Sequence, residues 1–127
     1  MASARVLYLD DEESLVFIVR RMLERLGHRV SGFTKSADAL AAFAAEPESF
    51  DLVMSDMSMP GMNGIDFATA VLAVRPQAFV VIASGYVEPK DAARALAAGV
   101  RHVVSKPNTI EEMRQMVVDL LPGIANS

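Results

Sequence analysis

The segment RVLYLDDE, residues 5–12, places a run of apolar side chains directly before three acidic ones. A short apolar run that stops at a polar cluster is typical of a buried strand. After it, apolar residues recur at helical spacing between Leu15 and Leu26, with arginines and glutamates between them, and Gly27 suits the end of a helix. The segment therefore predicts a strand and then a helix, with acidic residues at their junction.

The same strand and helix pattern recurs along the rest of the chain. Further strands are expected at residues 29–33, 51–55, 79–83 and 103–104. The helices between them are bounded by Ser36 and Pro47, by Gly64 and Pro76, and by Asp91 and Gly99, and a capping box of Thr109 and Glu112 begins the last one. The side chains expected to face the core are Leu40, Ala41 and Ala44, then Ile65, Ala68 and Leu72, and finally Ile110, Met113, Val117 and Leu120.

Five alternating strands and helices predict an α/β fold with a parallel sheet and helices on both faces. Right-handed crossovers leave few topologies, and the simplest is a doubly wound, flavodoxin-like sheet of order 2-1-3-4-5. The 127 residues match the usual size of one domain. We therefore expect a single domain over residues 1–127, with a core at about 5–121.

Composition and charge exclude several classes of function. The chain is 52% hydrophobic, and 16 acidic residues outnumber 12 basic ones, with no basic tract that could follow a nucleic-acid backbone. No apolar run approaches the length of a membrane span, and no signal-peptide core begins the chain, so we expect a cytoplasmic protein without nucleic-acid or membrane binding. The absence of cysteine excludes disulfides, thiolate zinc sites and a Cys nucleophile.

Polar side chains stand at the ends of four of the five expected strands. Asp10 and Asp11 follow the first strand, Asp56 the third, Ser84 the fourth and Lys106 the fifth. Because parallel strands end at the same edge of a sheet, and ligands bind there beside the point where strand order reverses, these side chains should converge.

Three converging carboxylates must hold protons or share a cation, and a hard ion such as Mg²⁺, or Mn²⁺ in its place, suits oxygen ligands. No zinc-type cluster competes, because His28 and His102 are far apart in the sequence and each is expected on the surface. Asp56 stands alone before an open loop and is the best nucleophile toward phosphorus. The charge of Lys106 and the hydroxyl of Ser84 could bind phosphoryl oxygens.

Each of these residues has an ordinary structural explanation when taken alone. An acidic pair after a strand often caps the following helix, Asp56 and Ser84 could be turn residues, and Lys106 could be a solvated loop charge. The combined hypothesis is stronger because four strand ends carry complementary side chains on one edge.

These residues give the chain a strong resemblance to the response-regulator receiver domain of two-component signalling, from Arg5 to Leu121. The matching motifs are Asp10-Asp11, Asp56, Pro60-Gly61, Asn63-Gly64, Ser84-Gly85 and Lys106-Pro107. The resemblance implies that Asp11, Asp56 and the backbone carbonyl of Ser58 bind Mg²⁺ directly, with Asp10 acting through water. It also implies a cis peptide bond between Lys106 and Pro107.

The resemblance further implies a regulatory domain rather than an enzyme, one that catalyses at most its own phosphorylation and dephosphorylation. Asp56 would accept the phosphoryl group from a phosphohistidine of a sensor histidine kinase or a histidine phosphotransfer protein docked near the first helix. The partner kinase, the signal, the output and a homodimer through the last helix are left open, as is whether this is a complete regulator or part of a larger chain.

Two positions depart from the family pattern. Val103 stands where the family usually has an aromatic switch residue, and Asn108 where it often has phenylalanine. We therefore expect Tyr86, two residues after Ser84, to report the state of Asp56 in place of that aromatic residue. For Asn108 we expect a consequence for local packing or docking.

Two alternative functions remain at this stage. A phosphatase of the haloacid dehalogenase type also uses an Asp nucleophile with Mg²⁺, but it needs a second Asp where this chain has Ser58, and the chain is too short for the usual cap. An interaction module that does not depend on phosphorylation is favoured by Val103, whereas the three aspartates and Lys106 argue against it.

Overall fold

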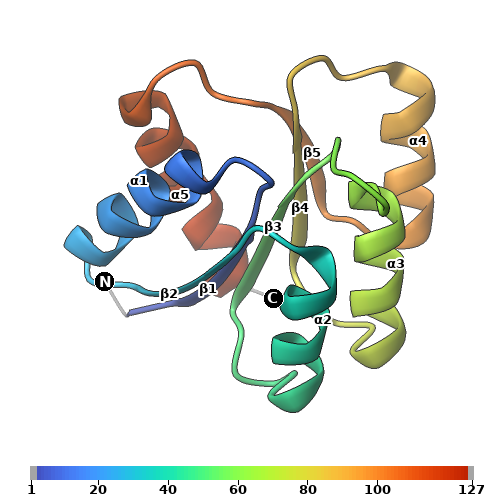
Figure 1. The fold of residues 1–127 in the computed structure, drawn as a ribbon, viewed down its shortest axis with the longest axis horizontal. Helices are drawn as coiled ribbons and strands as arrows, with labels where there is room; N and C mark the ends of the chain where they lie inside the picture. The colour runs from blue at the N-terminus through green and yellow to red at the C-terminus, as the bar shows by residue number, and fades with distance from the viewer. Residues whose placement is uncertain (1–2, 126–127) are drawn as a thin grey trace.

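The computed structural model of the chain describes residues 3–125, with side chains described as far as Leu120. Five strands alternate with five helices (Figure 1). In chain order the elements are β1 (Arg5–Leu9), α1 (Glu13–Arg25), β2 (Arg29–Phe33), α2 (Ser36–Ala45), β3 (Leu52–Asp56), α3 (Gly64–Val74), β4 (Val80–Ser84), α4 (Pro89–Ala98), β5 (His102–Ser105) and α5 (Ile110–Ala125). None of the helices in this part of the chain is long and apolar enough to cross a membrane.

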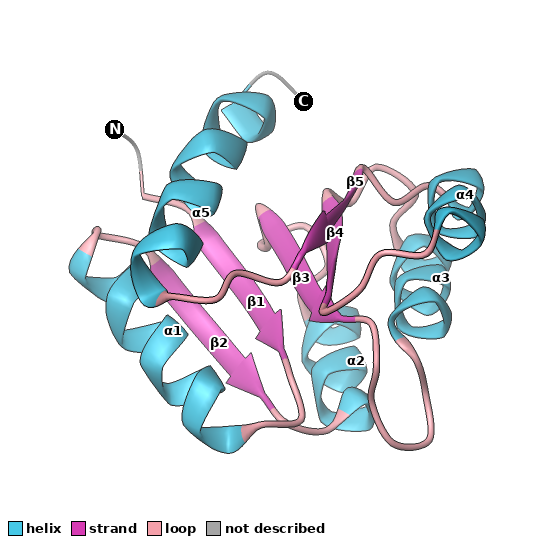
Figure 2. Ribbon diagram, turned by 90° about the horizontal axis from the view of Figure 1, so that it is seen from above, coloured by secondary structure: helices cyan, strands magenta, loops and turns pink. Residues whose placement is uncertain are grey.

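All strands pair in parallel, in the order β2-β1-β3-β4-β5, which confirms the predicted topology. Figure 2 shows α1 and α5 on one face of the sheet and α2, α3 and α4 on the other. The strand order reverses between β1 and β3, so the cleft for a ligand is expected at the carboxyl ends of these two strands.

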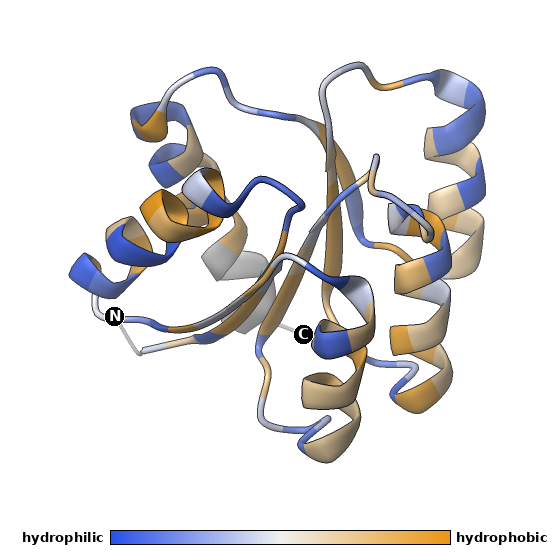
Figure 3. Cartoon of the chain, in the orientation of Figure 1, coloured by the Kyte–Doolittle hydropathy of each residue, from blue (hydrophilic) through white to orange (hydrophobic). Residues whose placement is uncertain are grey.

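The strands divide the core into two layers, because successive side chains point to opposite faces. In β1, Leu7 and Leu9 pack toward α2, α3 and α4, whereas Val6 and Tyr8 pack toward α1 and α5. Burying a leucine of this kind stabilises the fold by about 2 kcal/mol. Figure 3 shows the central strands coloured apolar and the segment after β1 coloured polar, which places the acidic residues at the rim of the core.

The helices bury somewhat different side chains from those predicted. In α2, Ala39 and Phe43 are fully buried, whereas Ala41 and Ala44 are exposed, so that part of the prediction was wrong. Alanine on every side of α2 gives no contrast from which to read the buried face. In α5, Met113 and Val117 are buried as predicted, but Ile110 is 42% exposed at the first residue of the helix.

Helix α1 also departs from its predicted pattern. Val16, Val19 and Leu23 form its buried face, whereas Ile18 and Leu26, which belong to the apolar series between Leu15 and Leu26, are exposed. Helix α1 therefore carries more apolar side chains than its contact with the sheet covers, and some of them are exposed on the surface.

The position of His28 also differs from the prediction. We expected it on the surface, but it is 5% exposed, and its Nδ1 accepts a hydrogen bond of 3.0 Å from the backbone N–H of Ala4. His102 is exposed as expected, with its ring 5.9 Å from that of Phe79. The buried His28 ties the segment before β1 to the segment before β2.

Candidate functional site

The alternation of side chains brings three of the predicted residues to one side of the sheet edge. Asp10 follows Tyr8 by two residues, Asp56 follows Met54 and Lys106 follows Val104, and these three preceding residues all pack in the layer under α1 and α5. Two residues along an extended chain return a side chain to the same face. Asp10, Asp56 and Lys106 therefore meet above that layer.

The carboxylates of Asp10, Asp11 and Asp56 form one cluster. One oxygen from each residue lies within 4.8 Å of the others. Asp10 is 1% exposed and Asp56 8%, while Asp11 is open to solvent. The donor set is all oxygen, which fits a hard divalent cation rather than zinc or copper.

Lys106 is the cation that the chain itself supplies to this cluster. Its Nζ lies 2.7 Å from Oδ2 of Asp10 and 3.5 Å from Oδ2 of Asp56. Burial and the neighbouring charge of Asp10 raise the pKa of Asp56, and Lys106 offsets this only in part. Burial works against the ammonium group of Lys106, but its hydrogen bond to Asp10 and the charges of Asp10 and Asp56 outweigh it and raise the pKa of the lysine.

Asp10 has two further hydrogen bonds. Its Oδ1 accepts from the backbone N–H of Glu12 at 2.9 Å, and its Oδ2 accepts from the hydroxyl of Tyr8 at 3.3 Å. Burial and the charge of Asp10 raise the pKa of Tyr8 far above its ordinary value, so the hydroxyl keeps its proton. Tyr8 was not among the predicted site residues, although a tyrosine two residues before Asp10 on a strand shares its face, and a buried tyrosine hydroxyl needs a partner.

Ser84 is close to the site, but its hydroxyl is turned elsewhere. It donates a hydrogen bond of 2.7 Å to the backbone carbonyl of Tyr86, and the Ser84 carbonyl accepts from the N–H of Lys106. The ring of Tyr86 is 75% exposed. Val103 is partly buried against the layer under α2, α3 and α4, and Ser58 is exposed in the loop after β3.

That loop is shaped by a close backbone approach. The N–H of Gly64 donates to the carbonyl of Met57 at 2.8 Å, and a Cβ on Gly64 would lie 2.6 Å from the carbonyl oxygen of Asp56. Only glycine fits there without moving the phosphoacceptor candidate. The side chain of Asn63 then caps α3 by accepting from the N–H of Asp66.

The peptide bond between Lys106 and Pro107 is trans, so the cis bond implied by the resemblance is wrong for this structure. The two isomers of an X-Pro bond differ by only about 1 kcal/mol, and Lys106 reaches Asp10 with the trans bond. The N-terminal cap of α5 is confirmed in part, because Thr109 Oγ1 accepts from the N–H of Glu112.

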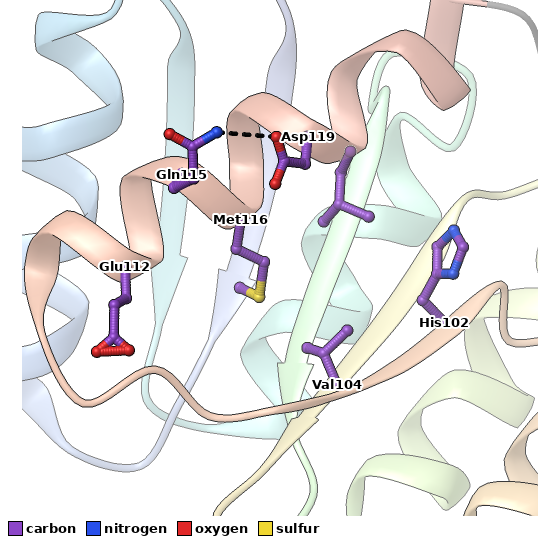
Figure 4. A pocket seen from close by; sticks show the side chains of 7 residues that line it. His102, Val104, Glu112, Gln115, Met116 and Asp119 are labelled. Carbon is purple, nitrogen blue, oxygen red and sulfur yellow. Dashed lines mark hydrogen bonds between the residues drawn. The ribbon is translucent and has the colours of Figure 1, made fainter.

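Two hollows of similar size differ in their position relative to the acidic cluster. One of about 460 Å³ is bordered by Asp11 of the acidic cluster, by the start of α2 at Lys35 and Ser36, and by the loop at Met59 and Pro60. The other, of about 470 Å³, lies between β5 and α5 (Figure 4). It is lined by His102, Val104, Glu112, Gln115, Met116, Asp119 and Leu120 and includes none of the acidic cluster.

Fold and site together define a class of protein. The chain is a doubly wound α/β domain with an acidic, oxygen-only cluster and one lysine at the point where the strand order reverses. The family described as "Response regulator receiver domain" matches residues 6–118, and the chain belongs to this family. It is a receiver domain of two-component signalling systems, and the members of this family have regulatory roles.

Individual relatives agree with this assignment. The sensory/regulatory protein RpfC of Xanthomonas campestris pv. campestris is 31% identical over 122 residues, which cover 93% of this chain and 16% of RpfC. The C4-dicarboxylate transport transcriptional regulatory protein DctD of Rhizobium meliloti is 29% identical, over 90% of this chain and 24% of DctD. The chain thus spans less than a quarter of these curated relatives, which include sensor proteins as well as regulators.

Solved structures share the fold. The chemotaxis protein CheY4 of Vibrio cholerae has a TM-score of 0.83 and 26% identity, over 93% of this chain and 98% of that one. A CheY-like receiver domain protein from Methanospirillum hungatei has a TM-score of 0.87 over 98% of both chains, and its 22% identity supports the fold alone.

Proposed function

We propose that Asp56 accepts a phosphoryl group in a Mg²⁺-dependent reaction and that this switches the surface of the domain. The observation that carries the proposal is the cluster of Asp10, Asp11 and Asp56, with Lys106 paired to Asp10 and Asp56. Mg²⁺ held by Asp11, Asp56 and the Ser58 carbonyl, with Asp10 nearby, would shield the charge of the nucleophile and of the phosphoryl oxygens.

Intact-mass measurement with acetyl phosphate and Mg²⁺ tests this proposal. We expect one added phosphoryl group on the native chain and none on Asp56→Asn. Asp66→Asn is the matched control, because it makes the same change on an exposed residue of α3 and should be labelled normally. Labelling of Asp56→Asn at the native level would overturn the assignment.

The same sample separates a receiver from a phosphatase of the haloacid dehalogenase type. We expect the domain to be labelled once and to lose the group slowly, because Ser58 offers no carboxylic acid to protonate a leaving group. Steady turnover of small phosphate esters that Asp56→Asn abolishes would favour the phosphatase.

We propose Ser84 and Tyr86 as the switch, with Val103 as the position that lacks the usual aromatic ring. The Ser84 hydroxyl now bonds to the Tyr86 carbonyl, so drawing it toward a phosphoryl group on Asp56 would release that carbonyl. Amide shifts recorded with and without beryllofluoride, a phosphoryl mimic, should change most between Ser84 and Pro89. Changes confined to α1 would contradict this. An equal response in Asp56→Asn would favour a module that does not depend on phosphorylation.

The phosphodonor is proposed to dock on α1, in the cytoplasm. Phe17, Ile18 and Leu26 are exposed there, and with Ile110 they line a hollow of about 560 Å³. Arg21, Arg25 and Arg114 border the same hollow. Apolar surface ringed by arginine suits the helical bundle of a histidine kinase or histidine phosphotransfer protein with an acidic rim.

Phe17→Ser separates docking from chemistry. We expect it to slow transfer from a phosphorylated histidine phosphotransfer domain and to leave labelling by acetyl phosphate unchanged, because Phe17 is 60% exposed and lies outside the acidic cluster. A matched change on another surface, Leu96→Ser on α4, should affect neither reaction.

A further inference from the structure

Tyr8 is a buried polar residue directly beneath the acidic cluster. It is 3% exposed, and its ring packs in the layer between the sheet and helices α1 and α5. Its hydroxyl reaches Oδ2 of Asp10, two residues along the same strand face. A hydroxyl placed in an apolar layer is costly unless it makes such a bond, so the pairing with Asp10 is a built feature of this core.

Asp10 is held by three donors of different kinds. The backbone N–H of Glu12 holds Oδ1, while Lys106 and Tyr8 share Oδ2. The ammonium group of Lys106 carries a positive charge, and the hydroxyl of Tyr8 does not. A divalent cation among the carboxylates would repel the ammonium group but not the neutral hydroxyl. Of the two donors to Oδ2, only the Tyr8 hydroxyl is therefore compatible with the site both with and without a bound cation.

We propose that Tyr8 is a positioning residue for the cation site, whose hydroxyl keeps the Asp10 carboxylate oriented when Lys106 turns from Asp10 toward a phosphoryl group. This inference rests on the proposed function for the movement of Lys106. The backbone N–H of Glu12 orients one carboxylate oxygen, and Tyr8 orients the other, which together fix the plane of the carboxylate. Asp10 would act on Mg²⁺ through water, and residues that orient such a carboxylate change metal affinity through it.

Isothermal titration of the full chain with Mg²⁺ tests the role of Tyr8. We expect Tyr8→Phe to bind Mg²⁺ about tenfold more weakly, because it removes the hydroxyl and keeps the ring. Val6→Ala is the matched control: Val6 is fully buried two residues earlier on the same strand face. It should lower the unfolding temperature in EDTA and leave the Mg²⁺ affinity unchanged. Native affinity in Tyr8→Phe, or an equal loss of affinity in Val6→Ala, would overturn the proposal.

A second titration separates the action of Tyr8 on Asp10 from an action through Lys106. In a Lys106→Met background, Tyr8→Phe should still lower Mg²⁺ affinity about tenfold, because the hydroxyl contacts Asp10 itself. If the effect disappears in that background, Tyr8 acts by placing Lys106 and the proposal is wrong.

The titrations also distinguish this proposal from the proposed function. If the native chain binds Mg²⁺ and Tyr8→Phe binds it more weakly, the role of Tyr8 stands even when acetyl phosphate leaves Asp56 unlabelled. If Asp56 is labelled and Tyr8→Phe binds Mg²⁺ normally, the receiver chemistry stands and the role of Tyr8 is refuted. A native chain that binds no Mg²⁺ refutes both.

Discussion

The two edges of the sheet differ in how their polar and charged side chains are paired. At the amino-terminal edge, Arg5 forms an ion pair of 2.5 Å with Glu46, hydrogen bonds to Ser49 and lies 4.4 Å above the ring of Phe50. Its backbone N–H donates to Asp51, and His28 accepts from Ala4 nearby. At the carboxyl-terminal edge, three carboxylates cluster, and Lys106 lies within ion-pair distance of two of them, Asp10 and Asp56.

This difference indicates that the carboxyl-terminal edge lowers the stability of the folded state. At the amino-terminal edge, the polar groups of Arg5, Ala4 and His28 described above find their partners within the chain. At the carboxyl-terminal edge, the three carboxylates carry more negative charge than Lys106 can neutralise. A bound cation would therefore stabilise this edge. Functional sites commonly reduce stability in this way, and the following changes test the contrast from the largest expected effect to the smallest.

Lys106→Met should have the largest effect, because it removes the only basic side chain within ion-pair distance of Asp10 and Asp56 in the described part of the chain. We expect a loss of about 3 kcal/mol in the free energy of unfolding, measured with urea in EDTA. Excess Mg²⁺ should restore part of it. The control is Lys90→Met on the exposed start of α4, which should change little. An equal loss in both variants would show that the edge is not under electrostatic strain.

His28→Phe should weaken the amino-terminal edge. It keeps a buried ring but leaves the N–H of Ala4 without its acceptor, which costs about 2 kcal/mol. Urea unfolding measures the loss, and amide exchange at Ala4 should accelerate. Mg²⁺ affinity should stay at the native value, because His28 lies at the opposite edge from the acids. The exposed His102 provides the matched control, His102→Phe, for which we expect little change.

Asp56→Asn should stabilise the chain in EDTA, by about 1 kcal/mol at pH 7.5. The pKa of Asp56 is raised in the folded state by burial and by Asp10, so the folded chain retains this proton when the unfolded chain has already released it. The stability of the native chain therefore falls as pH rises from the ordinary Asp pKa of about 3.9 through the raised folded value. The gain from Asp56→Asn should accordingly shrink at pH 4. A gain that is the same at both pH values would contradict this explanation.

The same contrast explains what the sequence could predict. The positions of Asp10, Asp56 and Lys106 follow from strand ends and topology, because parallel strands deliver their last residues to one edge whatever the details of packing. Tyr8 was within reach of the same reasoning, since alternation along β1 places it on the face of Asp10. The charged edge was predictable because its chemistry is concentrated at the strand ends.

The amino-terminal edge was harder to predict. The acceptor role of His28 depends on Ala4, 24 residues away in the sequence, and no local pattern indicates that pairing. The buried face of α2 could not be read from a helix in which alanine occupies all sides. The isomer of the Lys106–Pro107 bond also lacks a local signal, because the two forms are close in energy.

Asn108→Leu should have the smallest effect. It tests whether charge alone makes the carboxyl-terminal edge less stable. Asn108, Lys106 and Pro107 border a hollow of about 150 Å³ that also touches Ile18 and Met113. Leucine there would cover apolar surface, so we expect the free energy of unfolding to rise by about 0.5 kcal/mol in EDTA. Because the added side chain carries no charge, the gain should be the same at pH 4 and pH 7.5, unlike the gain from Asp56→Asn. A pH-dependent gain would mean that packing and charge at this edge are coupled, and the two edges would then differ in packing as well as in charge.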